Sequence, residues 1–411
     1  MSGEACSANR IDEFLEGKLS EVDEAALTEH LDRCQSCQQA LESRAGKPGD
    51  WQQARTCLAN ATQSKVDRSP TSSFGSCSDP DLPLAVRQVL DQLAPTDHPK
   101  SLGRIDGFEI LGVIGSGAMG VVLKAEDPPL ARIVALKVMN PSLAVSGTAR
   151  KRFAREAKAA AGVLHPNVIA IHGVSTDSDF PYLVMPYLKG ISLRQRVDKQ
   201  GPLSLVEILR IGSQIASGLA AAHQIGLIHR DIKPANVMLD CGIETAVITD
   251  LGLARTIDAA TLTRSGAITG TPEYMSPEQA RGDVIDPSSD LFSLGSVLYT
   301  LCTGRSPFRS QTAMGVLRRI TEESPPAIRE INPDIPAWLC TLIAQLHRKS
   351  PADRPTAAET HQTLERCLAH VHGPDRMPLP PELADQNTTP NPLVSRPFQT
   401  GALLMLLLIL G

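Results

Sequence analysis

The chain of 411 residues lacks an excess of positive charge. Its 40 Lys and Arg are outnumbered by 45 Asp and Glu, which gives a formal net charge of −5 and no electrostatic footprint for nucleic acid. Aromatic residues are also scarce at 3%, yet 42% hydrophobic and 21% charged residues describe a globular protein. Because one hydrophobic core rarely serves so long a chain, we expect two or more domains.

The cysteines do not form a disulfide framework. The nine of them are odd in number, scattered and mostly unclustered, which favours a reducing compartment. The N-terminal "MSGEACSANRIDEF" has neither a cationic lead nor an apolar run, so we expect no signal peptide. Cys6 follows no apolar stretch, which argues against a lipoprotein start, and we find no internal repeat.

Composition divides the chain into five segments. Residues 1–45 have apolar residues at helical spacing, whereas 46–104 are rich in Ser, Pro, Asp and Gln and predict a flexible linker in which "LAVRQVLDQL" forms an amphipathic turn or two. Residues 105–371 alternate between strand-like and helix-like stretches. A second Pro-rich linker is predicted over 372–400, and 401–411 is uninterrupted apolar sequence.

The octet "HRDIKPAN" at 229–236 is typical of a catalytic loop. It places Lys233 two residues after Asp231 and Asn236 five residues after it. A polar surface turn after a helix is the alternative. The two interpretations differ in whether the rest of the chain supplies partners for these side chains.

A glycine-rich turn lies between two strand-like stretches in "FEILGVIGSGAMGVVLKAE". Gly115, Gly117 and Gly120 match G-x-G-x-x-G, a pattern that dinucleotide-binding turns share. Here "VVLKAE" keeps strand alternation and Pro128-Pro129 prevents an immediate helix, so the Rossmann interpretation is disfavoured. Glycines on a β-hairpin allow backbone N–H groups to approach a triphosphate.

A lysine and an acid follow at suitable places. Lys137 stands among apolar neighbours in "RIVALKVM", so we expect it to point into a cleft and to need an anion. Glu156 lies on a predicted helix that "HPN" ends, and an ordinary helix salt bridge is the alternative to its pairing with Lys137. The apolar face of that helix is predicted to contain Phe153, Ala157, Ala160 and Leu164.

These motifs together resemble the protein-kinase family, specifically the bacterial serine/threonine kinases that are similar to eukaryotic ones. The resemblance covers roughly 105–371 and includes "GSGAMGVV", "VALK", "HRDIKPAN", "TDLGLA", "GTPEYMSPEQ", "DLFSLG" and "DRPTA" in this order. It implies an α+β, two-lobed kinase fold, with an antiparallel sheet and an αC helix in the N-lobe and a mainly helical C-lobe.

The resemblance also implies roles in phosphoryl transfer, which depends on positioning and charge neutralisation. Lys137 would hold the α- and β-phosphates, with Glu156 orienting it. Asp231 would accept the proton of the attacking hydroxyl, and Lys233 would steady the transferring phosphoryl group. Asn236 and Asp250 would coordinate Mg²⁺, with Mn²⁺ as a substitute, because hard cations prefer oxygen ligands.

An ATP site is implied by the same comparison, with Met185 as gatekeeper and "LVMPYLKG" as hinge. Pro186 departs from the commoner acidic residue, but proline keeps its carbonyl acceptor. Leu251 replaces the usual Phe in "DLG", a change that affects regulation more than catalysis. The implied nucleotide-binding residues are Ile114, Gly115, Ser116, Gly117, Ala118, Gly120, Val122, Ala135, Lys137, Glu156, Met185, Leu188, Met238 and Asp250.

Further positions concern substrate, regulation and support. Lys233 with Thr271 is typical of kinases that phosphorylate Ser or Thr. Residues 251–270 correspond to an activation loop, where Arg230 would bind a phosphate. The implied supports are Asp290 for the catalytic-loop backbone, Phe292 beside it, and a buried ion pair of Glu278 with Arg354. The candidate phosphorylation sites are Thr261, Thr263, Ser265 and Thr269.

A helix near the N-terminus carries possible zinc ligands. His30, Cys34 and Cys37 lie at i, i+4 and i+7, and Cys6 would complete a Cys₃His set for structural Zn²⁺. The pattern resembles the zinc-finger domain of anti-sigma factors, and two ordinary buried cysteines are the alternative. The acidic run "EVDEAALTEHLD" favours a regulatory protein partner over DNA.

The sequence therefore predicts an ATP-dependent serine/threonine protein kinase with protein substrates. Alternatives are a pseudokinase or an anti-sigma-like scaffold, against which the intact catalytic positions argue, and a small-molecule kinase, which "GTPEYMSPE" disfavours. The apolar stretch 401–411 is too short for the roughly 30 Å hydrocarbon core. We expect it to begin a transmembrane helix of a single-pass protein with a cytoplasmic kinase. Docking on the kinase or a membrane surface is the alternative.

Overall fold

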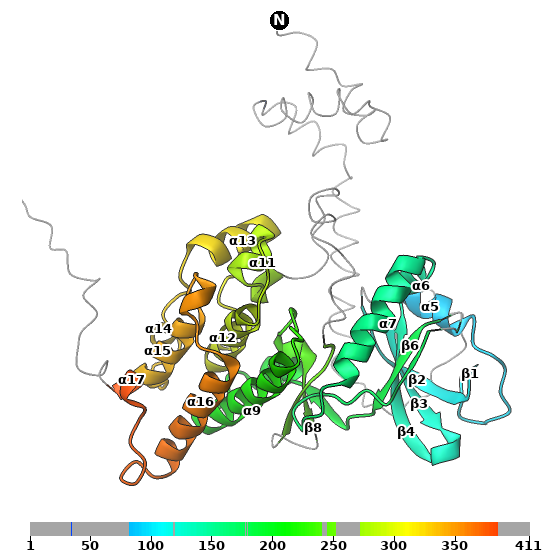
Figure 1. Ribbon diagram of the computed structural model, residues 1–411, viewed down its shortest axis with the longest axis horizontal. Coiled ribbons are helices and arrows are strands. Elements are labelled where there is room, and N and C mark those ends of the chain that lie inside the picture. Colours follow the sequence, from blue (N-terminus) through cyan, green and yellow to red (C-terminus); the bar gives the residue numbers. More distant parts are fainter. Residues whose placement is uncertain are drawn as a thin grey trace, which may run out of the picture. The chain divides into compact units, whose positions relative to one another are not determined.

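A computed structural model describes residues 34, 82–117, 120–176, 178, 180–240, 245–251 and 272–384. The chain divides into two compact units, 1–76 and 77–411, and all described residues except Cys34 belong to the second. This unit has two lobes, one built on a twisted sheet and one mainly helical (Figure 1). The two-lobed α+β architecture predicted from the sequence is confirmed.

The N-lobe contains a six-stranded antiparallel sheet in the order β1-β2-β3-β4-β6-β5. Alternate residues of β3 face the core, as strand alternation predicts, and include Val121, Leu123 and Ala125. The strands are β1 (Arg104–Ile105), β2 (Phe108–Gly117), β3 (Gly120–Asp127), β4 (Arg132–Met139), β5 (Gly173–Ser175) and β6 (Tyr182–Pro186).

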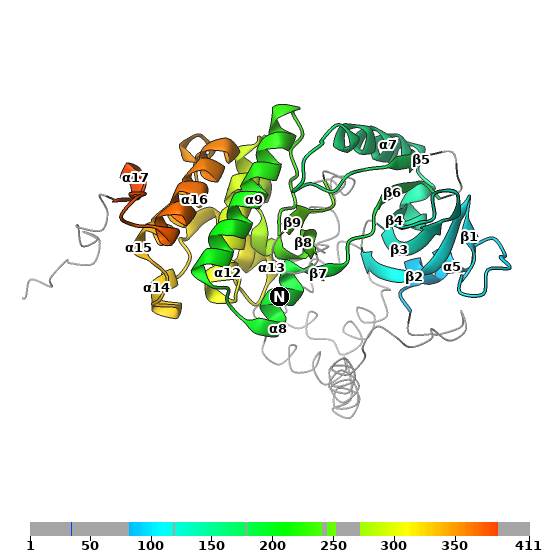
Figure 2. The same ribbon diagram turned by 90° about the horizontal axis from the view of Figure 1, so that it is seen from below.

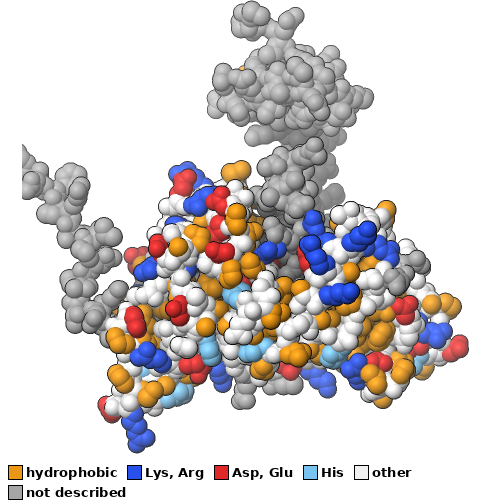
Figure 3. All heavy atoms as spheres, in the orientation of Figure 1, with side chains coloured by type: hydrophobic (Ala, Val, Ile, Leu, Met, Phe, Trp, Pro, Cys, Tyr) orange, Lys and Arg blue, Asp and Glu red, His pale blue; other side chains and the backbone are white. Residues whose placement is uncertain are grey.

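Two helices follow β4: α6 (Pro141–Ala144) and α7 (Gly147–Ala161). Asn140 and Ser146 cap them, each accepting a hydrogen bond from a backbone N–H of the first turn. Lys and Arg side chains gather over α7 in Figure 3, and Lys151, Arg155 and Lys158 are exposed. The helix therefore turns these three basic residues to solvent, whereas Arg150 is half-buried and donates to Thr176 O at 2.8 Å.

The apolar face of α7 is shorter than predicted. Phe153, Ala157 and Ala160 are buried, but Leu164 is 87% exposed. The helix ends at Ala161, before the "HPN" turn, so Leu164 does not continue the helical face. The predicted helical register therefore fails over its last residues.

An additional helix, α5 (Leu84–Leu90), packs on the N-lobe. Val86 and Val89 are 1% and 0% exposed and belong to the same apolar core as β2, β3 and β4. The helix lies against β3, β2 and α6 (Figure 1). The boundary drawn at Ile105 from composition therefore falls inside the packed lobe, and the second half of the predicted linker contributes to its core.

The C-lobe is built around two long helices, α9 (Leu205–Gln224) and α12 (Ser288–Thr303). Every residue of α12 after its first is buried, because other helices cover it on all sides. The remaining helices are α8 (Leu193–Gln200), α11 (Pro277–Arg281), α13 (Ala313–Glu322), α14 (Ile328–Ile331), α15 (Ala337–Leu346), α16 (Ala357–His372) and α17 (Pro381–Ala384).

A small antiparallel sheet lies on the side of the C-lobe nearest the N-lobe (Figure 2). It contains β7 (Gly190–Ser192), β8 (Val237–Asp240) and β9 (Thr245–Ile248). Ile169 N–H donates to Ile248 O at 2.9 Å, which ties the segment after α7 to β9. The sheet thus places the ends of the catalytic octet and of "TAVITD" side by side.

The packed C-lobe extends past Val371, where composition placed its end. Helix α16 continues to His372, and Leu383 of α17 is 1% exposed within the C-lobe core. Within the described part of the chain, α9 is the one helix long and apolar enough to cross a membrane, and more than half of it is buried in the lobe. Residues 401–411 lie outside the described residues.

Candidate active site

The side chain of Asp290 fixes the backbone at the start of the octet 229–236 by hydrogen bonds. This carboxylate is completely buried at the start of α12, and it accepts His229 N–H at 2.8 Å and Arg230 N–H at 2.7 Å. His229 Nε2 in turn donates to Thr249 O at 2.9 Å. The predicted bracing role of Asp290 is confirmed, and a buried anion held by several donors makes a rigid support.

Three polar side chains of the octet meet at one carboxylate oxygen. Oδ2 of Asp231 accepts hydrogen bonds from Lys233 Nζ at 2.7 Å and from Asn236 Nδ2 at 2.9 Å. Asn236 Nδ2 also donates to Asp231 O at 2.9 Å. This fixes the Asp231 side chain, and its second oxygen, Oδ1, accepts no hydrogen bond from the described residues.

Lys137 lies on β4 of the N-lobe. It is 5% exposed, and its Nζ donates to Oδ1 of Asp250 at 2.8 Å. Burial would raise the pKa of Asp250, but the Lys137 ammonium, assisted by His229 and Lys233, holds it below its usual value. The Asp250 carboxylate is thus an anionic partner of the buried Lys137, as we expected from its apolar neighbours. Glu156 is half-buried on α7, and its pairing with Lys137 stays a prediction.

Asp250 is tied to the octet through its neighbour. Thr249 N–H and Oγ1 both donate to Asn236 O, at 2.8 and 3.1 Å. Arg230 and Asp250 have φ angles of +67° and +63°, in the left-handed region that non-glycine residues rarely adopt. The loop therefore holds its functional residues in a backbone conformation that the surroundings impose.

The glycine-rich turn is a β-hairpin, as predicted. Gly117 pairs with Gly120 between β2 and β3. A Cβ at Gly120, where φ is +150°, would overlap Val138 O, so packing requires that glycine. A Cβ at Gly115 or Gly117 would meet nothing within 4 Å, so space beside them is open.

Apolar side chains from both lobes form one cluster beside this hairpin. Val122, Ala135, Met185 and Leu188, all predicted, pack together there, and Ala135 and Met185 are cross-strand partners. Two members were missed: Ile169 follows the "HPN" turn with no periodicity, and Val247 lies in an unbroken apolar run. Met238 is the cross-strand partner of Val247.

The predicted ion pair of Glu278 and Arg354 is confirmed. It is bidentate, with Nη1–Oε1 and Nη2–Oε2 distances of 2.6 and 2.8 Å, and the side chains are 3% and 0% exposed. Phe292 is fully buried and lies in contact with the Arg354 guanidinium. These groups join α11 and α12 of the C-lobe to the segment before α16.

Several predicted residues lie outside the described part of the chain. They are Ala118 of the glycine-rich turn, Thr261, Thr263, Ser265, Thr269 and Thr271 of the activation segment, and the zinc candidates Cys6, His30 and Cys37. Ile114, Gly115 and Ser116 lie on β2, where Ile114 is 48% exposed.

The N-terminal region matches a family model described as "Putative zinc-finger" over residues 8–38. The match contains His30, Cys34 and Cys37 and begins after Cys6.

Comparison with known proteins covers the kinase unit. The chain is 37% identical over 275 residues to serine/threonine-protein kinase PrkC of Bacillus subtilis, covering 67% of this chain and 42% of that protein. It is 40% identical over 264 residues to the kinase pkn3 of Myxococcus xanthus, covering 61% and 48%. The chain thus spans less than half the length of these relatives.

The crystal structure of the Mycobacterium tuberculosis PknI kinase domain matches the fold with a TM-score of 0.52. It is 28% identical and covers 64% of this chain and 96% of that domain. The family model "Protein kinase domain" matches residues 108–364, which contain the braced octet, the Lys137–Asp250 pair and the glycine hairpin. The chain therefore belongs to the protein kinase family.

Proposed function

We propose that this chain is an active serine/threonine protein kinase that transfers the γ-phosphoryl group of ATP to protein hydroxyls. The observation that carries the proposal is the fixed cluster of Asp231, Lys233 and Asn236, tied through Thr249 to Asp250 and its partner Lys137. This network brings together the candidate base, two lysines and two candidate metal ligands, which are groups that phosphoryl transfer uses.

The hydrogen bonds suggest a division of labour. Because Lys233 and Asn236 occupy Oδ2 of Asp231, Oδ1 is the oxygen that would accept the proton of the attacking Ser or Thr hydroxyl. Lys233 lies close enough to neutralise charge on the transferring group. Lys137 would exchange Asp250 for the α- and β-phosphates when the nucleotide binds, with Glu156 orienting it.

Asn236 and Asp250 fit a Mg²⁺ site. The amide nitrogen of Asn236 donates to Asp231, and its amide oxygen, which accepts no hydrogen bond from the described residues, would bind the metal ion. Asp250 has a depressed pKa and is therefore ionised near neutral pH, as a hard cation requires. Bound Mg²⁺ or Mn²⁺ would neutralise phosphate charge at this place.

The apolar cluster fits an adenine ring. Val122 and Ala135 would cover one side of the ring and Met238 with Val247 the other. The hinge beside Met185 offers the backbone of Pro186 and Leu188, and a proline carbonyl still accepts a hydrogen bond. The open space beside Gly115 and Gly117 would receive the phosphates.

Two substitutions test this proposal against the pseudokinase alternative. Asp231→Asn and Lys137→Met should each reduce ³²P transfer from Mg-ATP to the chain or to myelin basic protein by at least about 100-fold, because each removes transition-state stabilisation. Arg329→Ala, a substitution in α14 of the C-lobe, serves as the control and should retain activity. Transfer by either active-site variant within a few fold of wild type would refute the assigned roles.

We propose that phosphorylation of the activation segment regulates the kinase. Arg230 precedes the catalytic Asp231, and its backbone is fixed by Asp290 and by Gln279, whose Nε2 donates to Arg230 O at 2.7 Å. A guanidinium on so rigid a backbone suits a phosphate on Thr263 or Ser265. Mass spectrometry after incubation with Mg-ATP should find it there, and phosphate confined to 46–81 would contradict the proposal.

We propose that residues 1–45 bind one structural Zn²⁺ through Cys6, His30, Cys34 and Cys37 and recruit a regulatory protein partner. The family match over 8–38 supports three of these ligands. The full chain should retain about one zinc per molecule, and Cys34→Ser should release it. Full retention of zinc by this variant would contradict the assignment.

We propose a single-pass membrane protein with a cytoplasmic kinase. Its support is the uncharged stretch 401–411 and the greater length of the relatives. The open reading frame should continue beyond codon 411 with further apolar residues. A stop codon directly after it, with the protein in the soluble cell fraction, would refute this.

A further inference from the structure

We propose that helix α7 carries a docking surface for an anionic lipid membrane. The inference rests on the proposed membrane location of the kinase. Lys151, Arg155 and Lys158 lie at i, i+4 and i+7 of α7, so they share one face of the helix, and all three are exposed. Figure 3 shows Lys and Arg side chains gathered over this helix.

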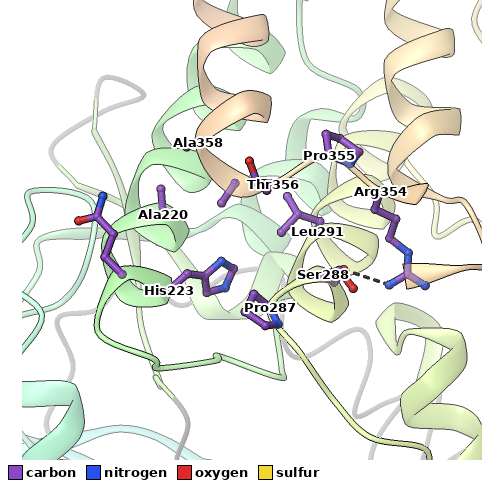
Figure 4. Close-up of a pocket in the computed structure, with 11 residues that line it drawn as sticks. Ala220, His223, Pro287, Ser288, Leu291, Arg354, Pro355, Thr356 and Ala358 are labelled. Atoms are coloured by element: carbon purple, nitrogen blue, oxygen red, sulfur yellow. Dashed lines mark hydrogen bonds between the residues drawn. The ribbon is translucent and has the colours of Figure 1, made fainter. Parts of the chain in front are cut away.

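These three cations lack counter-charges. Among the described residues, no carboxylate lies within ion-pair distance of them. By contrast, Arg354 of the C-lobe is paired with Glu278 and donates to Ser288 O at 3.0 Å (Figure 4). The stretch 140–167 contains five Lys and Arg and one acidic residue, Glu156, which gives it a net charge of +4 in a chain of −5. Like charges four residues apart repel on a helix, and a negatively charged surface would relieve that repulsion.

Exposed apolar side chains lie at both ends of α7. Val145, directly before the N-cap of the helix, is 89% exposed, and Leu164, three residues after its last residue, is 87% exposed. Among the large apolar side chains of the described residues, only Val284 is more exposed. Ile225 is 52% exposed and lies beside the helix end, because a Cβ on Gly162 would be 3.5 Å from its Cδ1. Cations combined with exposed apolar groups are typical of surfaces that lie on a bilayer.

The chain after the described part limits the distance between this surface and the bilayer. The structure describes α17 up to Ala384, and the apolar stretch begins at 401. The 16 residues of 385–400 span at most about 55 Å when fully extended. A tether of this length keeps the effective concentration of lipid headgroups high, so that weak attractions suffice for docking. This favours lipid over an acidic protein as the partner of α7.

The experiment measures flotation of the full chain with vesicles. One set contains phosphatidylglycerol and phosphatidylcholine in equal amounts, and the other contains phosphatidylcholine alone. Wild type should bind the anionic vesicles more tightly, and added NaCl should reduce the difference. Lys151→Glu/Arg155→Glu/Lys158→Glu should raise the lipid concentration needed for half-maximal binding by at least about 100-fold, because each cation near an anionic leaflet contributes roughly fivefold.

A matched control makes the same change of net charge elsewhere. Arg305→Glu/Arg329→Glu/Arg366→Glu alters three exposed residues of the C-lobe and should stay within about threefold of wild type, because charges far from the lipid are screened. Val145→Ser/Leu164→Ser should weaken binding several fold without changing its salt dependence, because apolar insertion is not screened by ions. All three variants change exposed side chains, so their unfolding midpoints should match wild type.

The proposal would be overturned if the control triple lost as much binding as the α7 triple, or if wild type bound both kinds of vesicle equally. Binding to polyglutamate but not to anionic vesicles would also overturn it and would assign the face to an acidic protein. The stretch 401–411 is the same in every variant, so its own binding cancels in the comparison. Failure of wild type to transfer phosphate would overturn the proposed kinase activity and leave these binding results unaffected.

Discussion

Helix α5 gives the sharpest test of where the kinase unit begins. Val86 and Val89 are 1% and 0% exposed in the N-lobe core, whereas Leu84 on the same helix is 65% exposed. Replacing both valines by alanine removes two carbons at each site, at about 0.8 kcal/mol per buried methylene-sized group. The double substitution should therefore cost at least about 3 kcal/mol, with the cavity adding to this.

The assay is calorimetric unfolding of the full chain. A loss of about 3 kcal/mol lowers the midpoint by roughly 6–12 °C in a domain of about 150–250 residues, and the shift should fall on the unfolding transition of the unit that contains both lobes. Leu84→Ala is the matched control and should stay within about 0.5 kcal/mol of wild type. If the double variant had the same unfolding midpoint as the control, α5 would not be part of the folded lobe and the packing argument would be refuted.

Three other outcomes follow from the structure. Gly120→Ala should cost about 1–3 kcal/mol in thermal unfolding because its Cβ meets backbone, whereas Gly115→Ala should keep stability and raise the KM for ATP. Arg354→Met should cost about 3–5 kcal/mol in urea unfolding at pH 7, because it strands a buried carboxylate. Burial raises the pKa of Glu278, but the hydrogen bonds from Arg354 outweigh it, so the pKa is lower in the folded chain than in the unfolded one. The ion pair therefore stabilises the folded state fully above the unfolded pKa of about 4.3, and this contribution is lost as the pH falls. The deficit of Arg354→Met should therefore shrink at acid pH, and a constant deficit would contradict the argument.

The sequence predicted which polar side chains of the octet lie together, because they sit in a motif of fixed spacing, whereas the pairing of Glu156 with Lys137 stays a prediction. The octet alone places Asp231, Lys233 and Asn236 within one turn, and their hydrogen bonds follow from that spacing. Asp290 and the Glu278–Arg354 pair were also predicted in their observed roles. Short-range spacing accounts for the octet, whereas the resemblance to the kinase family supplied the two long-range results, since Asp290 lies 60 residues from Arg230 and Glu278 lies 76 residues from Arg354.

Long-range packing was harder to predict. Ile169 and Val247 join the apolar cluster through pairing between distant segments, which no local period records. Leu164 was placed on the apolar face of α7 because the apolar pattern ran on past the helix end at Ala161. Val86 and Val89 lie in a segment whose Ser- and Pro-rich surroundings hid a short buried helix. In each case tertiary contacts decided the outcome.

The left-handed backbone of Arg230 and Asp250 has an evolutionary consequence. A non-glycine residue in that region lowers the stability of the folded state by about 1–2 kcal/mol relative to glycine. At Arg230 and Asp250 the chain therefore keeps residues that selection for stability alone would replace. A homologue that had lost catalysis would be expected to drift toward Gly or Asn at these two positions and to gain stability as it did so. Gly or Asn at these two positions would therefore mark an inactive homologue from its sequence alone.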